Sequence, residues 1–330
     1  MANHPYRPSP VKRILPAVML LLALVLSSCA GPASQPQEGY QRLVILGDPH
    51  LPGRDLANKE AVITTITNWP DVAAVIAVGD LAAEFGTDAE YAAARQFFAP
   101  LRVPFYPVTG NHDYIYASPP GGKGALTIAS LTEQQAKLRL FRDSFRLPHI
   151  SYSQRIGSYQ LIFLSADRSD FLSGLSEGQL DWLRGELAKN RALPTIVVFH
   201  GPLTGTLRNY RHWINTPDFV AQPIAAIDSI IRDNPQIFLW LSGHTHTPAT
   251  EESYASPINL YAGQVTNIHN KDLNRGTIWT NSLFLYPDRV IVRTYNHSEK
   301  IWLTDLERVI RPPQLAESTK KVAEPLAKTN

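Results

Sequence analysis

Side chains that bind metal ions follow five separate apolar runs in this sequence. They are Asp48, His50, Asp80, Asn111, His200, His244 and His246. Carboxylate, imidazole and amide ligands without a thiolate are typical of sites for Mn, Fe or Zn that do chemistry, and not of a structural zinc site. If two ions lie about 3.5–4 Å apart, one carboxylate must bridge them. We therefore predict a site for two divalent metal ions.

The charge of such a site predicts the class of substrate. Two divalent ions bring four positive charges, Asp48 and Asp80 remove two, and a bridging hydroxide removes one. The remaining positive charge attracts an anionic ester, for which phosphate is the natural candidate. The ions would also lower the pKa of their shared water to about 7 and hold it in line with phosphorus.

The elements that must position these ligands follow from alternating apolar and amphipathic segments. Apolar runs predict buried strands at 43–46, 75–78, 103–108, 159–165, 195–199 and 237–241. Alternating residues in the C-terminal part predict antiparallel strands at 258–260, 278–279, 282–286 and 290–295. Amphipathic runs predict helices at 56–69, 88–98 and 176–189. Strands that alternate with helices indicate a layered α/β fold. Ligands at the carboxyl ends of such strands can meet in one crevice.

Two local features support this convergence. Asp48 and His50 are two residues apart, as are His244 and His246, so in extended segments each pair would face one side. A glycine also stands directly before a ligand at four places, where it would allow a sharp turn and close approach of the backbone. These glycines are Gly47, Gly79, Gly110 and Gly243.

Together these segments resemble the five motifs of the calcineurin-like metallophosphoesterases. The matching segments are Asp48-Pro49-His50, Gly79-Asp80, Gly110-Asn111-His112-Asp113, His200 and Gly243-His244-Thr245-His246. The resemblance covers about residues 43–265. It implies a four-layer α-β-β-α sandwich of two mixed sheets flanked by helices. It also implies hydrolysis of a phosphomonoester or phosphodiester, with a metal-bridging hydroxide as the nucleophile.

The resemblance also implies a role for each residue. The first metal ion would be held by Asp48, His50 and His246, the second by Asn111, His200 and His244, and both by Asp80. His112 would face the substrate and donate a proton to the leaving oxygen, and Asp113 would orient its imidazole. Ala83 stands where purple acid phosphatases carry a tyrosine, which argues against a tyrosinate-bound ferric site.

Other functions of the same fold remain open. The substrate is expected to be a phosphorylated small molecule or a nucleotide, and cyclic-nucleotide phosphodiesterases share the same motifs. A non-catalytic scaffold that binds a partner or metal is a further alternative, although such proteins usually lose ligands that are present here. Substrate contacts are conceivable for Arg54, Tyr114 and His212, which lie in or beside loops that follow the motifs. For His212, a plain solvated loop is the competing reading.

The composition of the chain limits the classes of fold and function that it can have. The chain has 330 residues, 44% of them hydrophobic, and a formal net charge of +2. This is a globular composition, and the near-neutral charge argues against a sequence-specific nucleic-acid surface. Because the motifs extend from residue 48 to 246, we predict one metallophosphoesterase domain over 41–311 and a disordered tail over 312–330. The oligomeric state cannot be read from the sequence.

The N-terminus has the pattern of an export signal. Lys12 and Arg13 precede an apolar stretch over 14–26, shorter than the roughly 20 residues that span a bilayer. We predict a signal peptide over 1–28, followed by Cys29 in a segment that resembles the bacterial lipobox. The resemblance implies an acylated Cys29, a flexible tether over 29–40, and a lipoprotein facing the periplasm or the cell exterior. An ordinary signal peptide with an incidental cysteine is the alternative.

Overall fold

The computed structural model describes residues 1, 39–119, 121 and 124–315. The predicted signal peptide, Cys29 and most of the predicted tether and tail therefore lie outside the described residues. The sheets and helices belong to one unit that begins at Tyr40. No helix among the described residues is long and apolar enough to cross a membrane.

The first sheet has six strands in the order β12-β11-β10-β1-β2-β3. They are β1 (Gln41–Leu46), β2 (Val72–Ala77), β3 (Phe105–Pro107), β10 (Trp279–Leu285), β11 (Val290–Asn296) and β12 (Ile301–Ile310). The strands β1, β2 and β3 run parallel, whereas β10 pairs antiparallel with β1 and continues into an antiparallel ladder. Strand β1 therefore lies between β2, which follows it closely in the sequence, and β10, which comes much later.

The second sheet also has six strands, in the order β4-β5-β6-β7-β9-β8. They are β4 (Tyr152–Ile156), β5 (Tyr159–Phe163), β6 (Thr195–Val198), β7 (Ile237–Ser242), β8 (Leu260–Tyr261) and β9 (Val265–His269). The central strands β5, β6, β7 and β9 are parallel, and the two outer strands are antiparallel to their neighbours. Both sheets are therefore mixed, as the sequence predicted.

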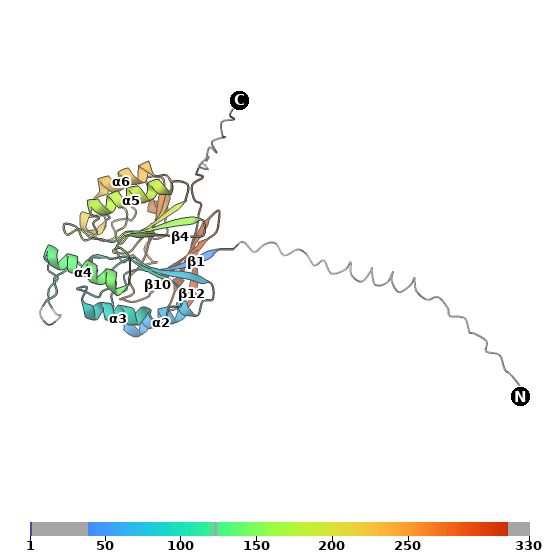
Figure 1. Ribbon diagram of the computed structural model, residues 1–330, viewed down its shortest axis with the longest axis horizontal. Helices are drawn as coiled ribbons and strands as arrows, with labels where there is room; N and C mark the ends of the chain where they lie inside the picture. The colour runs from blue at the N-terminus through green and yellow to red at the C-terminus, as the bar shows by residue number, and fades with distance from the viewer. Residues whose placement is uncertain (2–38, 120, 122–123, 316–330) are drawn as a thin grey trace, which may run out of the picture. The chain divides into compact units, whose positions relative to one another are not determined.

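Helices cover the outer face of each sheet (Figure 1). Packed on the first sheet are α2 (Leu56–Thr67), α3 (Asp88–Phe98) and α4 (Leu131–Ser144). Packed on the second are α5 (Glu177–Lys189) and α6 (Ile224–Asp233). The described residues include the short 3-10 helices η1 (Asn111–Asp113), η3 (Pro217–Phe219) and η4 (Pro257–Asn259). The order of layers is helix, sheet, sheet, helix, which confirms the predicted fold.

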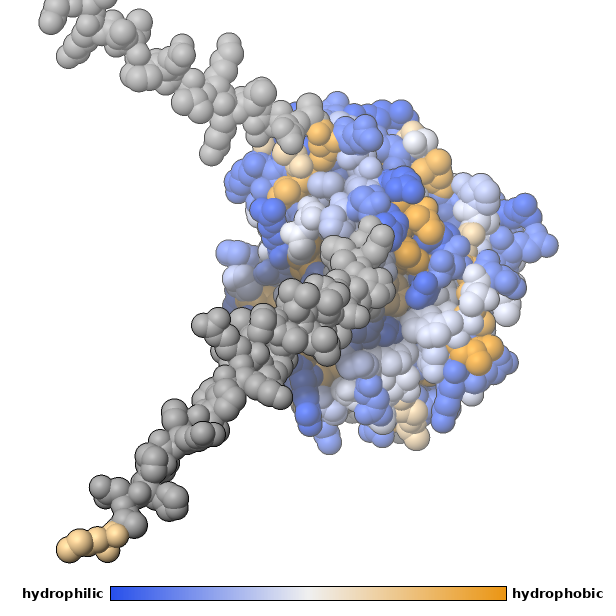
Figure 2. Space-filling view, turned by 90° about the vertical axis from the view of Figure 1, so that its right-hand side faces the viewer, coloured by the Kyte–Doolittle hydropathy of each residue, from blue (hydrophilic) through white to orange (hydrophobic). Residues whose placement is uncertain are grey.

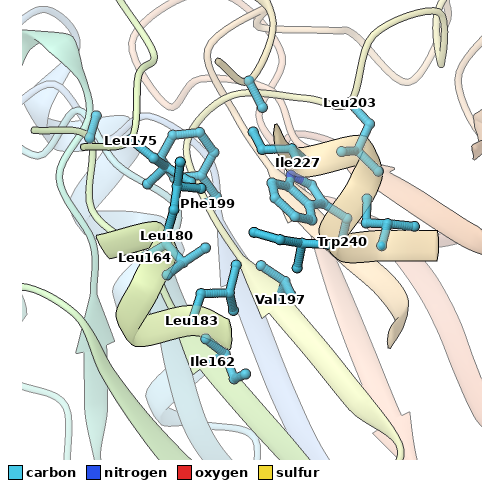
Figure 3. Packing of buried hydrophobic residues seen from close by; sticks show 14 of the residues in the cluster. Ile162, Leu164, Leu175, Leu180, Leu183, Val197, Phe199, Leu203, Ile227 and Trp240 are labelled. Atoms are coloured by element: carbon cyan, nitrogen blue, oxygen red, sulfur yellow. The ribbon is translucent and has the colours of Figure 1, made fainter. Parts of the chain in front are cut away.

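Alternation along β1 shows how the layers are joined. Leu43 and Ile45 pack between the two sheets, while Val44 and Leu46 pack under the helices. Because both faces of the strand are buried, it reads as a continuous apolar run. Each such side chain contributes about 1.5–3 kcal/mol on burial. The equivalent core over the second sheet is filled by side chains such as Trp240 (Figure 3).

The predicted helices at 56–69, 88–98 and 176–189 are confirmed as α2, α3 and α5. The last begins as expected, with the hydroxyl of Ser176 accepting from the amide of Gln179 at 3.3 Å. The strand expected over 258–260 is wrong for its first residues. There Pro257 opens η4, since its fixed φ suits a helical turn, and β8 starts only at Leu260.

Several elements were not predicted at all, namely α4, α6, β4, β9 and β12. Of these, β9 lies parallel to β7 inside the second sheet and β12 forms an edge of the first. On the face shown in Figure 2, hydrophobic residues lie scattered among hydrophilic ones. Single exposed apolar residues of this kind are normal for a protein surface.

Candidate metal centre

The predicted ligands meet at the carboxyl ends of the parallel strands of both sheets. Their ligand atoms form two groups in which all lie within 4.8 Å of one another. The first group is Asp48, His50, Asp80 and His246, and the second group is Asp80, His200 and His244. The one remaining predicted ligand, Asn111, places its Oδ1 3.1 Å from Nε2 of His200. Asp80 is common to both groups, as a bridging residue must be.

The backbone at these residues is left-handed. The φ angles are 24° at Asp48, 47° at His50, 51° at Asp80, 64° at His244 and 48° at His246. The extended conformation expected for Asp48 with His50 and for His244 with His246 is therefore wrong. The chain instead turns sharply as it leaves each strand, a conformation that Asp and His adopt more readily than most residues and that is concentrated at functional sites.

Two glycines allow the carboxylates to lie against the backbone. A Cβ atom at Gly243 would lie 1.9 Å from Oδ1 of Asp48, and one at Gly110 would lie 2.3 Å from Oδ1 of Asp80. Any side chain at these positions would push a carboxylate out of place. The close approach predicted for the glycines is confirmed at both.

Asp80 carries one satisfied and one unsatisfied oxygen. Its Oδ1 accepts from the amide of His112 at 2.8 Å. Its Oδ2 is buried without a hydrogen-bond partner among the described residues, 3.4 Å from Nε2 of His200 and 3.9 Å from Nε2 of His50. An unpaired buried carboxylate oxygen is costly. A cation between the two imidazoles would satisfy it, so the residues present fit a bridged pair of metal ions.

His200 turns the ring nitrogen that a metal ion would take toward the second group. Its Nδ1 donates to the carbonyl of Val78 at 2.9 Å, so Nε2 is the nitrogen that a metal ion would bind in place of a proton. Nε2 faces Oδ1 of Asn111, whose amide is oriented by donation from Nδ2 to the hydroxyl of Tyr116 at 3.1 Å. Burial lowers the pKa of His200, but the nearby Asp80 and Asp48 outweigh it and raise the pKa to about 9. The same negative field favours a metal cation.

His244 is held just as firmly. Its Nε2 donates to the carbonyl of Asp218 at 2.8 Å, and its ring stacks on Phe219 at 4.8 Å. Burial and, second to it, the neighbouring His200 lower the pKa of His244 to about 3. The ring therefore stays neutral at ordinary pH and presents Nδ1 to the second group.

The first group is arranged around Asp48. Its Oδ2 lies 2.8 Å from Nε2 of His246, which in turn lies 3.3 Å from Nε2 of His50. The carboxylate also accepts from the amide of His244 at 2.9 Å. Burial lowers the pKa of His50 to about 4, so that this imidazole is neutral at pH 7 as a ligand must be.

His112 lies beside the first group without being part of it. Its ring centroid is 4.9 Å from that of His50, and its Nδ1 lies 3.3 Å from the carbonyl of Glu84. The ring is half-buried and lines the pocket over the metal groups. This position suits a group that meets the substrate.

Asp113 does not contact the imidazole of His112, contrary to the role expected from the sequence. Its carboxylate accepts from the amides of Gly110 at 2.8 Å, Ala82 at 3.0 Å and Leu81 at 3.2 Å. Burial and Asp80 raise the pKa of Asp113 to about 7, against these amides, which lower it. Asp113 therefore fastens the loop that carries Asp80 to the turn that carries Asn111.

A cavity of about 360 Å³ opens over the first group. It is lined by His50, His112 and His246 and by Arg54, Ala83, Glu84, Gly124, Leu126, Asn274 and Arg275. Of the substrate contacts considered from the sequence, Arg54 lies here. Tyr114 is buried elsewhere, with its hydroxyl donating to the carbonyl of Arg168, and His212 is exposed outside this pocket.

Sequence reasoning missed Lys59, a buried residue of α2. Its Nζ donates to the carbonyls of Pro49 at 2.8 Å and His50 at 2.7 Å, and to Oδ1 of Asn274 at 2.9 Å. The ammonium group thus holds the loop of the first group in its left-handed form. A signal was present, because Lys59 falls on the same helical face as the buried Val62 and Ile66.

Comparisons with known proteins agree with this geometry. The model of the family described as calcineurin-like phosphoesterase matches residues 41–248. A dimetal phosphatase from Danio rerio aligns with a TM-score of 0.56 at 14% identity, over 83% of this chain and 99% of that one. The purple acid phosphatase PPD1 from yellow lupin gives 0.53 at 15%, over 80% and 53%. GAP50, the anchor in the inner membrane complex of Plasmodium, gives 0.51 at 12%, over 83% and 89%. A search of curated proteins found no match.

Proposed function

Because this chain belongs to the calcineurin-like phosphoesterases, we propose that it hydrolyses a phosphoric ester at two divalent metal ions. The proposed ligands are Asp48, His50 and His246 for one ion, Asn111, His200 and His244 for the other, and Asp80 for both. The unpartnered Oδ2 of Asp80, which lies between His50 and His200, is the observation that carries this proposal. Mn, Fe and Zn all suit the nitrogen and oxygen ligands.

In the proposed reaction the chain would supply a general acid and positively charged residues that bind the substrate. Bound divalent ions would activate a water molecule and neutralise charge on the phosphate. Because Nδ1 of His112 faces the carbonyl of Glu84, Nε2 is the ring nitrogen that would meet the leaving oxygen. Arg54 and Arg275 add positive charge to the pocket rim, which suits an anionic small molecule or nucleotide.

A substrate panel tests the proposed activity. The full-length chain would be purified in detergent, stripped with a chelator and reloaded with Mn, Fe or Zn. Aryl phosphate, bis-aryl phosphate and a cyclic nucleotide then distinguish monoesterase from diesterase activity. We expect turnover with at least one metal and none in the stripped protein. If no metal supports turnover of any of these esters, the proposed activity is wrong.

We also propose that the enzyme is a lipoprotein anchored through Cys29 and facing the periplasm or the cell exterior. The support is the sole cysteine of the chain at the end of a signal-like stretch. Cys29→Ala should stop processing and acylation, which mass spectrometry and membrane fractionation would detect. A Cys29→Ala protein with the wild-type mass and membrane association would refute the anchor.

A further inference from the structure

The cavity over the first group is lined by charged residues from one part of the chain and by apolar residues from another. Arg54 and Arg275 come from two segments that Asn274 joins, because its Oδ1 accepts from the amide of Arg54 at 2.7 Å. Gly124 and Leu126 come from the segment that leads into α4. A phosphoric ester likewise consists of an anionic head and an alcohol. The arginines suit the head, so the apolar residues are candidates for binding the alcohol.

The segment that carries Leu126 is fixed against the residues of the site. Two main-chain hydrogen bonds, of 2.7 and 2.9 Å, flank Tyr116 and Ile128, which stand opposite each other in an antiparallel bridge. Side chains opposite each other in such a bridge lie on the same face. The ring of Tyr116 packs against that of His112, with centroids 5.2 Å apart, and its hydroxyl accepts from Nδ2 of Asn111 at 3.1 Å. Ile128 is therefore held close to the proposed acid.

Leu126 and Ile128 form an exposed apolar strip at this cavity. Their exposed fractions are 48% and 56%. Residues 126–128 lie outside any helix and have no positive φ, so the spacing of two residues places both side chains on one face. A single exposed apolar residue needs no explanation. Two on one face, beside a pocket with charged residues, are typical of a surface that contacts a ligand.

The chemistry of the strip indicates the kind of alcohol. Nucleobases are bound by stacking on aromatic rings and by hydrogen bonds, and neither Leu126 nor Ile128 offers these. The nearby ring of Tyr116 is only 8% exposed, so it does not serve as a stacking surface. Among the described residues that line the cavity, Glu84 alone is acidic, and it disfavours a second anionic group. A neutral alkyl chain fits these conditions.

We propose that Leu126 and Ile128 bind the alcohol part of the substrate, and that the substrate is a phosphoric ester of an alkyl alcohol. This inference rests on the proposed function, whose substrate it narrows. The anionic head lies toward Arg54 and Arg275, and the alkyl chain runs past His112 along the strip. Each methylene that the strip removes from water strengthens binding by up to about fourfold.

Alkylphosphonates test the strip without turnover, because their carbon–phosphorus bond is not hydrolysed. Binding of methylphosphonate and hexylphosphonate to the Zn²⁺-loaded full-length chain would be measured by calorimetry at one detergent concentration. We expect hexylphosphonate to bind at least about tenfold more tightly than methylphosphonate. Equal affinities, or no binding of either phosphonate, would overturn the inference.

A double variant, Leu126→Gln with Ile128→Gln, tests whether the strip causes this preference. Both side chains are exposed, so the fold should tolerate the change, and the hexyl advantage should fall to about threefold or less. The matched control is Ile258→Gln with Leu260→Gln, two apolar residues at the same spacing whose exposed fractions are 37% and 50%. It should keep the wild-type ratio. Ligand that enters detergent micelles is lost equally to all three proteins.

Two further outcomes separate this inference from its alternatives. If the double variant keeps the wild-type ratio but turns a dimer into a monomer in light scattering, a second copy of the chain covers the strip and the inference is wrong. If the ratio depends on the strip as expected but none of the esters is turned over with any metal, the proposed hydrolysis fails and the binding of alkyl groups stands.

Discussion

In the second group, the rings of His200 and His244 each donate to a main-chain carbonyl, whereas His246 in the first group faces the side chains of Arg275 and Asp272. The carbonyls belong to the main chain, directly after β2 and in η3. Side-chain partners can exchange. The second group is therefore fixed by the fold before any metal arrives, and the first group depends on charged residues around it.

Burial follows the same division. The side chain of His200 is fully buried, while that of His246 is 19% exposed at the pocket. The first group also relies on the ammonium of Lys59 to hold its loop. A sequence can therefore contain every metal ligand although main-chain hydrogen bonds fix the histidines of only one of the two groups.

Asp80 belongs to both groups, so its loss should abolish metal binding by the first and the second group alike. Asp80→Ala takes away the only carboxylate common to the two groups, so both ions should be lost and hydrolysis should fall to background. Metal content by mass spectrometry and turnover of an aryl phosphate measure this. Retention of one ion at full occupancy would mean that Asp80 does not bridge.

His112 should separate catalysis from metal binding. His112→Ala removes the proposed acid while all ligands remain, so the metal content should stay and activity should fall roughly 10²–10⁴-fold. His149→Ala, at an exposed histidine, is the control and should leave both unchanged. Loss of both ions in His112→Ala would show that this residue is a ligand after all.

Replacement of Lys59 should weaken metal binding by the first group only. Lys59→Met leaves the carbonyls of Pro49 and His50 without a donor, which should lower the free energy of unfolding by about 4 kcal/mol. Urea denaturation measures this, with the exposed Lys189→Met as control. In the folded variant, one of two Zn²⁺ sites should weaken. Equal weakening of both Zn²⁺ sites would contradict the independence of the two ligand groups.

The pH dependence of the stability of the metal-free protein should report the protonation of His200 in the second group. The pKa of His200 is raised to about 9 in the folded chain, above the ordinary value of about 6.5. Its protonation therefore stabilises the fold fully below about pH 6.5, and this contribution is lost as the pH rises through about 9. The loss is on the order of 3 kcal/mol. Urea midpoints at pH 6 and pH 10 should differ less in His200→Asn than in wild type, and equal differences would contradict the raised pKa.

The sequence predicted the inner part of the site because its signals are local. Each ligand follows an apolar run, and a buried strand with a polar end is visible in a few residues, as in Ile237–Leu241 before His244. The same holds for α5, whose start is marked by Ser176 and Gln179. Fold class followed from the alternation of such elements.

The outer part of the site could not be predicted because its contacts join distant segments. Nothing near Asp272 in the sequence indicates that it faces His246. The place of Lys59 on the apolar face of its helix indicates burial, but not that its ammonium group meets the carbonyl of His50. The expected contact from Asp113 to His112 failed for a related reason. The backbone turns left-handed at the motifs, and simple spacing along an extended chain no longer tells where side chains point.

The pairing of β1 with β10 has a consequence for the time course of folding. Arg42 in β1 meets Ser282 in β10, 240 residues further along the chain. Contacts so far apart close late and slow the search for the native state. Strand β1, which leads into Asp48, is synthesised long before its neighbour β10. We therefore expect metal uptake to follow completion of the chain, so that no ion can act as an early nucleus.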